Sequence, residues 1–368
     1  MNPSLICIAG GGTGGHVMPA LALADAARAH WSHVEVSFIG AERGLEAKLL
    51  PERGEEVLLL AMHSIQGAGW LQRIRVLLWQ LPCAVWRILM TWRLQRKPQV
   101  VVGVGGYASV AGVIAALLVR IPVVLYEQNA IPGLVNRLLY RFCRCMMLGF
   151  ASAQQHLPQH AQKTVVTGNV IRQAIQDVTY QIPARPCLLV MGGSQGAMFL
   201  NQTVPLACVA LAEQGLDFSV VHLVGAGDGR VDAVHEVYAQ AAIQADVRHY
   251  CDDMPALFSQ GSLMIARSGA MTVGEVAAVA MPAFFVPLPS AADQHQYYNA
   301  LSLADVGAAE IIDQQTCTAA TLAIQLKNTL FDAEKLQNMA KAAKNHAIVD
   351  ASARQLQVLQ TFVGEVPA

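Results

Sequence analysis

Residues 5–24 read LICIAGGGTGGHVMPALALA, and residues 187–211 read CLLVMGGSQGAMFLNQTVPLACVAL. Each stretch is an apolar run, a glycine-rich turn and a second apolar run with helical spacing. This is the pattern of a strand, a phosphate-type loop and a helix. It occurs twice, about 182 residues apart. The chain is therefore predicted to contain two Rossmann-like domains, each opening with its own glycine loop.

Apolar, β-branched runs alternate with helical patterns through the 368-residue chain. We expect strands at LICIA, EVSFIG, VVVGV, PVVLYEQ, CLLVM, FSVVHLVG, LMIARS and AFFVPL. This repetition predicts an α/β fold with parallel sheets and helices on both faces. Turn signals divide the chain into a first domain over 1–168 and a second over 169–344. The last segment, 345–368, has helical spacing and is expected to complete the first domain.

The segment from Val101 to Val119 has nineteen residues without a charge, which is long enough to span a bilayer. Four glycines interrupt it, however, and Arg120 and Pro122 follow directly. We therefore favour a strand, a glycine loop, a helix and a second strand, since buried parallel strands read as continuous apolar runs. We expect no secretory signal, because the first residues carry no basic segment. The eight cysteines lack CxxC spacing, so reduced thiols in a cytosolic chain are expected.

The net charge is −1, but the two halves of the chain differ in sign. Residues 1–170 carry 15 Lys and Arg against 8 Asp and Glu, or +7, whereas residues 171–368 carry 10 against 18, or −8. Glu127 is the only acid between positions 57 and 176, where twelve basic side chains occur. A basic half suggests an anionic surface or substrate on that side, and compositional drift is the alternative.

Residues 61–97 differ from their surroundings in composition. They contain four of the five tryptophans and six basic residues, with no acid. Tryptophan and arginine on an apolar helical pattern are typical of a segment lying in a membrane interface. The alternative is packing against the domain's own sheet, which part of the segment must do. We predict that the membrane contacts are made by Trp70, Arg73, Trp79 and Trp86.

Three glycine loops follow predicted strands, where parallel α/β sheets bind ligands. The first matches GxGxxG at Gly10, Gly12 and Gly15, with Glu42 after the next strand, which alone would suggest NAD; a plain tight turn gives the same match. The others are GVGGYAS (103–109) and MGGSQGA (191–197). Glycines let backbone amides approach an anion at a helix N-terminus. We expect more than one phosphate-bearing ligand, in one cleft if the domains face each other.

The stretch ARSGAMTVGEVAAVAMPAFFVPLPSAADQHQYYNA (266–300) is rich in groups that suit a nucleotide sugar. A strand ends at Arg267-Ser268, and Glu275 is expected in the first turns of the following helix. An acid there complements the helix dipole and can accept hydrogen bonds from vicinal ribose hydroxyls; an acid that serves the dipole alone is the alternative. The segment from Asp293 to Asn299 supplies uncharged donors and acceptors suited to sugar hydroxyls.

The chain resembles the MurG family of UDP-N-acetylglucosamine:lipid I N-acetylglucosaminyltransferases nearly end to end. The resemblance rests on GGTGGHVMPALALA (11–24), VGVGGYASVAG (102–112), PVVLYEQNAIPGLVNR (122–137), VTGNVIR (166–172), MGGSQGA (191–197), ARSGAMTVGE (266–275) and DQHQYYNA (293–300). It implies the GT-B architecture, with two Rossmann-like domains facing a cleft. It also implies inverting transfer of GlcNAc from UDP-GlcNAc to the C4 hydroxyl of MurNAc in lipid I, giving lipid II. This chain departs from the family pattern at Tyr126, usually His, and at Val170, usually Pro.

The resemblance places the donor site mainly in the second domain. The residues it implies for UDP-GlcNAc binding are Thr13, Gly14, Gly15, Asn129, Arg172, Ser194, Gln195, Cys251, Ala270, Met271, Thr272, Val273, Gly274, Glu275 and Gln296. Among them, Arg172 and the loop at 194–195 would contact the diphosphate or nearby donor atoms. Glu275 would hold the ribose diol, and Gln296 would contact hydroxyls of GlcNAc.

The acceptor hydroxyl must lose a proton, and His16 and Glu127 are the candidate bases, each following a first-domain strand. A histidine that only pairs locally at a helix N-terminus is the alternative for His16. Surrounding positive charge is expected to keep Glu127 ionised, so that it either acts as the base or orients His16 or the acceptor. Tyr107 is a third polar group of the catalytic site, more suited to acceptor binding than to proton transfer.

No DxD triplet occurs in the sequence. Glycine-loop amides, helix dipoles and Arg172 are therefore expected to stabilise the leaving diphosphate, with no cofactor and no obligate protein-bound metal. The expected partners are UDP-GlcNAc, lipid I, an anionic membrane surface and other cell-wall synthesis proteins, but no nucleic acid. A peripheral protein on the cytoplasmic face of the inner membrane is expected.

Three other functions stay open. An NAD-dependent oxidoreductase fits GxGxxG but does not need the second glycine-rich opening or the 266–300 block. A membrane-bound scaffold that binds a nucleotide sugar without catalysis would differ by its lack of turnover. A related transferase with another sugar or acceptor also fits, because Gln296 and its neighbours limit the donor only loosely.

Overall fold

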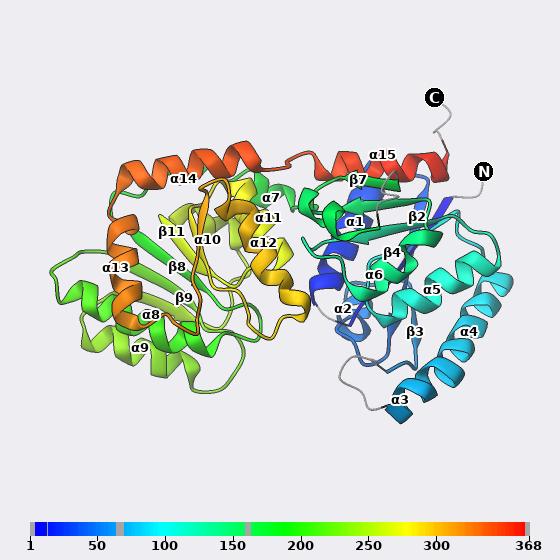
Figure 1. The fold of residues 1–368 in the computed structure, drawn as a ribbon, viewed down its shortest axis with the longest axis horizontal. Coiled ribbons are helices and arrows are strands. Elements are labelled where there is room, and N and C mark those ends of the chain that lie inside the picture. The colour runs from blue at the N-terminus through cyan, green and yellow to red at the C-terminus, as the bar shows by residue number, and fades with distance from the viewer. Residues whose placement is uncertain (1–3, 13, 64–69, 159–162, 365–368) are drawn as a thin grey trace. The chain divides into compact units, whose positions relative to one another are not determined.

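The structure is a computed structural model that describes residues 4–12, 14–63, 70–158 and 163–364 (Figure 1). The chain forms two compact units. Unit 1 comprises Met1–Val170 and Asp350–Ala368, and unit 2 comprises Ile171–Val349. Unit 1 is therefore built from both ends of the chain, and unit 2 is contiguous.

Unit 1 contains a seven-stranded parallel sheet in the order β3-β2-β1-β4-β5-β6-β7. Its strands are β1 (Ser4–Ala9), β2 (Val34–Ala41), β3 (Val57–Leu60), β4 (Val100–Gly103), β5 (Val123–Glu127), β6 (Cys145–Leu148) and β7 (Thr164–Val166). Its helices are α1 (Gly14–His30), α2 (Glu46–Glu52), α3 (Trp70–Arg75), α4 (Leu81–Leu94), α5 (Tyr107–Leu118), α6 (Leu134–Leu139) and α15 (Ala351–Val363). A π-helical turn, Val76–Gln80, joins α3 to α4, and 3-10 turns lie at Tyr140–Phe142 and Ala151–His156.

Both faces of this sheet are covered, because successive residues of a strand point to opposite sides. Ile6 and Ile8 belong to a buried cluster that includes residues of α1 and α15. Cys7 and Ala9 belong to a second cluster that includes residues of α4 and α5. The C-terminal helix α15 contacts α1, β1 and β4, so the last helix closes the core that the first strand opens.

Unit 2 contains a six-stranded parallel sheet in the order β10-β9-β8-β11-β12-β13. Its strands are β8 (Cys187–Met191), β9 (Ser219–Leu223), β10 (Gln244–Arg248), β11 (Leu263–Ala266), β12 (Ala283–Phe285) and β13 (Ala309–Ile311). Its helices are α7 (Gln173–Gln176), α8 (Met198–Ala212), α9 (Arg230–Gln240), α10 (Met254–Gln260), α11 (Ala270–Val279), α12 (His295–Ala304), α13 (Ala319–Leu330) and α14 (Ala333–His346). A 3-10 turn, Ala292–Gln294, precedes α12.

The predicted α/β fold with two parallel-sheet units is confirmed. Each of the eight expected apolar runs forms a strand, and the uncharged segment 101–119 is the end of β4, a glycine loop and α5. Among the described residues, no helix has both the length and the apolar character that crossing a bilayer requires. All eight cysteines lie in the described part of the chain and are free thiols.

Candidate active site

In each unit the strand order reverses beside the first strand, between β1 and β4 in unit 1 and between β8 and β11 in unit 2. Loops that follow the two strands diverge there, and open parallel sheets bind their ligands at this point. The loops are 10–12 and 104–106 in unit 1, and 192–197 and 267–269 in unit 2. They contain or adjoin most of the residues that the sequence singled out.

The two loops of unit 1 pack backbone against backbone. Gly10, Gly11 and Gly12 have φ angles of 151°, 149° and 100°. A β-carbon at Gly106 would overlap the Gly11 carbonyl oxygen. Only glycine permits both the backbone angles and the close approach, so the glycines of this loop have a structural cause.

His16 and Tyr107 lie at this edge of the sheet. His16 is the third residue of α1, partly exposed, and a β-carbon at Gly105 would lie 2.9 Å from its Nε2 atom. Tyr107 begins α5, and burial and the nearby Glu46 carboxylate raise the pKa of its hydroxyl. Its hydroxyl therefore stays protonated at neutral pH. Gly14 and Gly15 open α1, whereas Thr13 lies outside the described residues.

Glu127 ends β5 and is only 2% exposed. Its Oε1 atom accepts hydrogen bonds from the amide and the Nδ2 atom of Asn129 at 3.0 and 3.3 Å. Its Oε2 atom accepts from the Gly133 amide at 2.8 Å and from Asn136 Nδ2 at 2.9 Å. Burial raises the pKa of Glu127 above its usual range, and these hydrogen bonds offset part of that rise. Local donors, rather than the expected surrounding positive charge, are what favour the ionised form.

The two departures from the family pattern lie together in unit 1. Tyr126 is fully buried, and its hydroxyl donates to Asn169 Oδ1 at 2.9 Å. A backbone hydrogen bond from Val170 also reaches the Tyr126 hydroxyl and lowers its pKa, which burial raises. Proline has no N–H to donate, so the valine at 170 suits the tyrosine at 126.

In unit 2, Ser194 and Gln195 are exposed in the loop after β8. The Ser194 carbonyl accepts from the Ala226 amide at 2.9 Å, and the Gln195 carbonyl accepts from Arg230 Nη1 at 2.7 Å. A β-carbon at Gly196 would overlap the Val224 carbonyl. The loop after β9 thus holds this loop by its backbone and leaves both side chains available for a ligand.

The N-terminus of α11 follows β11 directly. Gly269 is its extended N-cap residue, and no side chain of the described residues caps the helix. The first amides of a helix lack intrahelical partners and carry partial positive charge, which suits a diphosphate or a carbonyl oxygen. Ala270, Met271, Thr272, Val273 and Gly274 form this turn and the start of the next.

Glu275 stands in the second turn of α11, and not in the first, so the helix dipole acts on it only weakly. Its side chain is 15% exposed and lies 3.7 Å from Arg172 Nη2, on the segment before α7. The pKa of Glu275 is raised to about 7, because the effect of burial outweighs the lowering by Arg172. The structure therefore brings together the cation and the acid that the sequence placed 103 positions apart.

Cys251 and Gln296 have local partners. The Cys251 thiol donates to the Asp253 carbonyl at 3.2 Å, and Gln296 Oε1 accepts from the Leu288 amide at 3.0 Å. Cys251 follows β10, two strands from β8, whereas Gln296 lies in α12, after β12. Asp293 and Gln294, just before α12, both have left-handed backbones with φ of 50° and 53°, a strained arrangement that is common at ligand sites.

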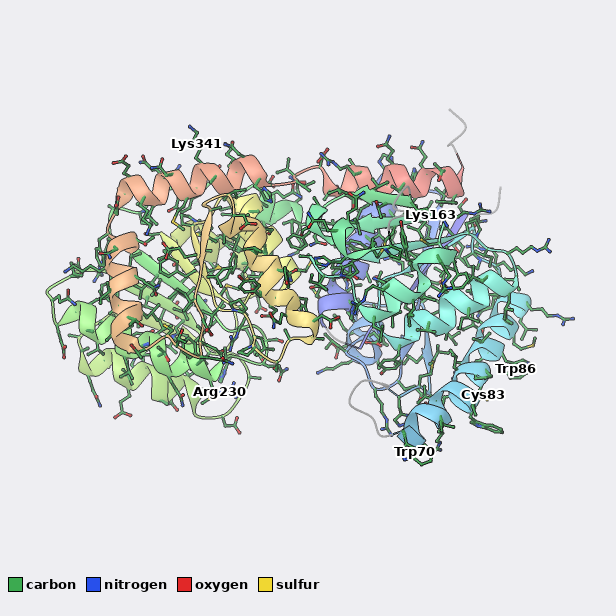
Figure 2. The ribbon with its side chains drawn as sticks, in the orientation of Figure 1. Trp70, Cys83, Trp86, Lys163, Arg230 and Lys341 are labelled. Carbon is green, nitrogen blue, oxygen red and sulfur yellow. The ribbon has the colours of Figure 1, made fainter. Side chains whose placement is uncertain are left out.

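The helices over residues 70–94 carry an apolar surface on one side. We define the tryptophan surface as the exposed side chains Trp70, Ile74, Leu78, Trp79 and Trp86. Figure 2 shows Trp70 and Trp86 projecting from α3 and α4. Trp79 is 71% exposed, whereas Ile88 and Trp92 on α4 are buried against the sheet. Part of the segment therefore packs against its own sheet, whereas contact of the exposed side chains with a membrane stays a prediction; the side chain of Arg73 lies outside the described residues.

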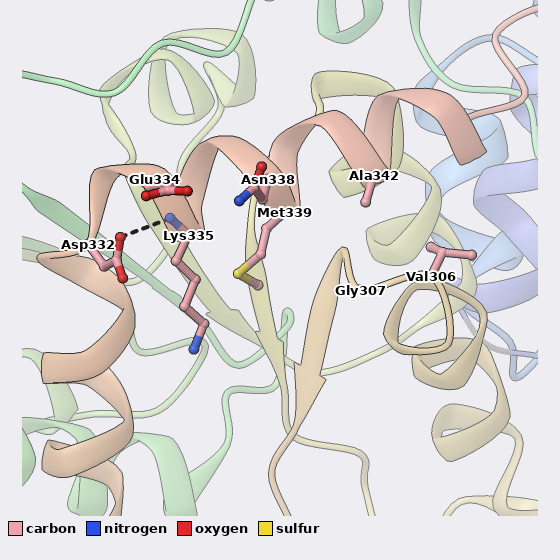
Figure 3. A pocket seen from close by; sticks show the side chains of 8 residues that line it. All are labelled: Val306, Gly307, Asp332, Glu334, Lys335, Asn338, Met339 and Ala342. Atoms are coloured by element: carbon pink, nitrogen blue, oxygen red, sulfur yellow. Dashed lines mark hydrogen bonds between the residues drawn. The ribbon is translucent and has the colours of Figure 1, made fainter.

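A depression of about 550 Å³ lies beside α14, where Asp332 Oδ1 accepts from the Lys335 amide at 2.9 Å (Figure 3). A second depression, of about 480 Å³, lies between residues of the three strands β1, β2 and β3 on one side and the end of α4 on the other. Neither is lined by a residue that the sequence predicted for the site.

Sequence reasoning missed two groups in unit 1. Glu46 reaches the first glycine loop, although Glu42 was the acid considered there. Asn136 binds Glu127 from nine positions away. The sequence did contain a signal for Glu46: Gly40 and Gly44 precede it closely, and both leave room for its side chain.

Both units match family descriptions. Residues 6–148 match "Glycosyltransferase family 28 N-terminal domain", and residues 187–355 match "Glycosyltransferase family 28 C-terminal domain". The curated protein of Syntrophotalea carbinolica named UDP-N-acetylglucosamine--N-acetylmuramyl-(pentapeptide) pyrophosphoryl-undecaprenol N-acetylglucosamine transferase is 38% identical over 364 residues. That alignment covers 98% of this chain and 99% of the relative.

Two further relatives agree. A protein of the same name from Aeromonas hydrophila is 40% identical over 362 residues, covering 96% of this chain and 95% of its own. The crystal structure of Acinetobacter baumannii MurG has a TM-score of 0.80 and 32% sequence identity, covering 98% of this chain and 100% of that one. The chain therefore belongs to the MurG family of N-acetylglucosaminyltransferases, which are built from the two glycosyltransferase family 28 domains.

Proposed function

We propose that the two units share the reaction of this enzyme, the transfer of GlcNAc from UDP-GlcNAc to lipid I, which forms lipid II. Unit 2 binds UDP-GlcNAc, and unit 1 binds the acceptor and supplies the base. The observation that carries the donor assignment is the approach of Arg172, at the start of α7, to Glu275 on α11, whose N-terminus has no side-chain cap among the described residues. A cation and helix amides suit a diphosphate, and the acid suits a ribose diol.

In the proposed reaction, the C4 oxygen of MurNAc bonds to C1 of GlcNAc with inversion while the bond from C1 to the UDP oxygen breaks. The hydroxyl proton passes to the base, and UDP leaves with the bonding electron pair. Arg172, the first amides of α11 and the loop at 194–195 receive the negative charge that develops on UDP. Such preorganised donors are usually the largest single contribution to catalysis.

His16 is the base in this proposal. It is partly exposed at the start of α1, where an acceptor can reach it. Glu127 is 2% exposed, and its oxygens already accept four hydrogen bonds, so its role is to hold the loop over 127–136. Tyr107, protonated at neutral pH, donates to the acceptor, while Gly14, Gly15 and Asn129 contact the sugar.

Unit 1 also attaches to the membrane in this proposal. The tryptophan surface enters the interface, and the basic residues of the same helices meet anionic lipid head groups. Each basic residue near such a surface contributes about 1 kcal/mol, so a few give reversible attachment. The enzyme is then a peripheral protein on the cytoplasmic face of the inner membrane, where lipid I and other cell-wall synthesis proteins are its partners.

Ligand-induced thermal stabilisation tests the donor site, with UDP, UDP-GlcNAc, UDP-glucose and NAD compared at saturation. A ligand at 100 times its Kd stabilises by about 2.7 kcal/mol. We expect stabilisation by UDP and UDP-GlcNAc but not by NAD. Transfer to a water-soluble lipid I analogue then separates an enzyme from a scaffold that only binds the donor. Stabilisation by NAD alone, or absence of transfer, would contradict the proposal.

A further inference from the structure

The first glycine loop encloses a carboxylate that belongs to the chain itself. Glu46 is the first residue of α2, and it is only 1% exposed. Its Oε2 atom accepts a hydrogen bond from the Gly12 amide at 2.8 Å. Its Oε1 atom accepts one from the Ala41 amide, at the end of β2, at 2.9 Å. Both oxygens of a buried acid therefore bind backbone N–H groups, one of them in the loop after β1.

Three glycines make room for this side chain. A β-carbon at Gly11, Gly40 or Gly44 would overlap the side chain of Glu46. These glycines come from the loop after β1, from β2 and from the segment before α2. The bare backbone around residue 11 is thus explained by an internal acid and does not require an external ligand.

This arrangement also argues against a dinucleotide at the loop. A pyrophosphate bound in the usual way would need the loop amides and would sit at the start of α1. The Gly12 amide already has an acceptor, and a second anion beside the Glu46 carboxylate would meet like-charge repulsion. The GxGxxG match of unit 1 therefore does not indicate NAD.

We propose that Glu46 is a positioning residue that acts as a built-in anion: its carboxylate holds the loop at 10–12 and thereby fixes the entry of α1 and the place of His16. The loop lies between Glu46 on one side and the 104–106 loop on the other, where the His16 ring adjoins Gly105. The inference rests on the proposed role of His16 as the base. The proposed role of Glu46 requires a negative charge at this position, so an uncharged side chain of the same size is not sufficient.

Two substitutions separate charge from shape. Glu46→Gln keeps the size but turns an NH₂ group toward one of the two backbone N–H groups, so one hydrogen bond is lost. Glu46→Ala empties the enclosure, which formate, a small carboxylate, then fills. Formamide has nearly the same shape without the charge and is the matched additive. Glu52→Ala, an exposed acid at the other end of α2, is the matched control variant.

We expect Glu46→Gln to lower kcat for GlcNAc transfer at least tenfold, with the Kd for UDP within twofold of the parent, because the donor site lies in unit 2. Formate at about 100 mM should raise the kcat of Glu46→Ala at least fivefold, whereas formamide should not. Glu52→Ala should keep the parental kcat. Amide hydrogen exchange in peptides covering residues 9–17 should accelerate in Glu46→Gln, whatever the activity.

The outcomes separate this inference from the proposed function. A parent chain without transfer activity would contradict the function, and the exchange measurement would then decide the inference. A Glu46→Gln variant with parental kcat and unchanged exchange would overturn the inference alone. Equal rescue by formate and formamide, or none in a Glu46→Ala variant that still binds UDP, would also overturn it. Should Glu46→Ala fail to fold, Glu46→Gln decides.

Discussion

The guanidinium of Arg172 lies 3.7 Å from the carboxylate of Glu275, an acid whose pKa burial raises to about 7. If the ionised acid accepts hydrogen bonds from the ribose diol, UDP affinity must rise as pH passes through this value. We expect about a tenfold gain in affinity between pH 6 and pH 8, since only the ionised fraction binds.

Calorimetric titration with UDP over this range measures the effect. Glu275→Gln is the reference, because it keeps the titration of UDP itself and removes that of the acid. The variant should bind more weakly at pH 8 and show a flatter profile. Arg172→Ala should move the midpoint to higher pH, as it removes the charge that lowers the pKa. Parental affinity in Glu275→Gln at pH 8 would contradict the ribose assignment.

His16→Ala should lower kcat about 100-fold or more, since positioned general bases typically contribute 10²–10⁴. The Kd for UDP should stay within twofold. His30→Ala is the matched control, because His30 is exposed at the opposite end of the same helix. Steady-state kinetics with a soluble lipid I analogue gives both values, and a His16→Ala variant with more than half of the parental kcat would exclude the histidine as the base.

Glu127→Ala should destabilise unit 1, because four hydrogen-bond donors lose their acceptor. Leaving a buried hydrogen-bond donor without its acceptor costs about 1–3 kcal/mol. Thermal unfolding should therefore begin at a lower temperature, and Asn136→Ala should show a smaller shift in the same direction. If Glu127→Gln lost kcat while its unfolding temperature stayed parental, the acid would be a catalytic residue instead of a structural one.

The double variant Trp79→Ala/Trp86→Ala should bind anionic vesicles at least tenfold more weakly. Burying a large apolar side chain contributes about 1.5–3 kcal/mol, and both indoles are exposed. Leu206→Ala on α8 of unit 2 removes another exposed apolar group and serves as the control. Vesicle co-sedimentation measures binding, and the Kd for UDP should be unchanged in all variants. Equal sedimentation of parent and double variant would rule out this surface.

Acid should destabilise unit 2 through His222. The imidazole is fully buried, with Nδ1 2.9 Å from the Tyr238 hydroxyl and Nε2 3.1 Å from Asn201 Oδ1. Burial lowers its pKa to about 3, whereas an unfolded histidine titrates near 6.5. Between these values the unfolded chain binds the extra proton, so stability is lost as pH falls.

The expected loss is roughly 1 kcal/mol for each pH unit below 6.5. Urea unfolding of the full chain from pH 7 to pH 4 measures it, with His222→Gln as the reference that lacks this titration. A parent curve that runs parallel to that of the variant would mean that His222 binds its proton as readily in the folded as in the unfolded chain.

The repeated strand, glycine loop and helix predicted both sheets, because that pattern is local and each apolar run is fully buried. The strands β3, β6, β7, β10 and β13 were not singled out from the sequence, although β3 and β6 are apolar and as long as β4 and β11. β10 reads QADVR at one edge of its sheet, and β7 and β13 have three residues each. Their pairing depends on neighbouring strands already in place, which no short window of sequence contains.

The positions of the candidate residues at the carboxyl edge of the sheet could be predicted from the sequence: Glu127 ends β5, and His16 and Tyr107 lie at the starts of the helices that follow β1 and β4. Their surroundings could not. The sequence showed positive charge around Glu127, yet the groups that bind it are two backbone amides and two asparagine side chains. Glu46 was missed because its partners, Gly12 in the loop after β1 and Ala41 at the end of β2, meet only in the folded sheet.

The split of unit 1 between the two ends of the chain has a consequence for biosynthesis. Ser4 Oγ donates to the Val363 carbonyl at 3.0 Å, and Leu359 of α15 is fully buried in the core that β1 opens. The ribosome synthesises α15 only after the whole of residues 171–349. Unit 2 can therefore finish folding first, although domains are usually completed in order from the N-terminus. A nascent chain stalled before residue 350 holds a complete unit 2 and a unit 1 in which part of one sheet face is still uncovered, a natural substrate for chaperones and proteases.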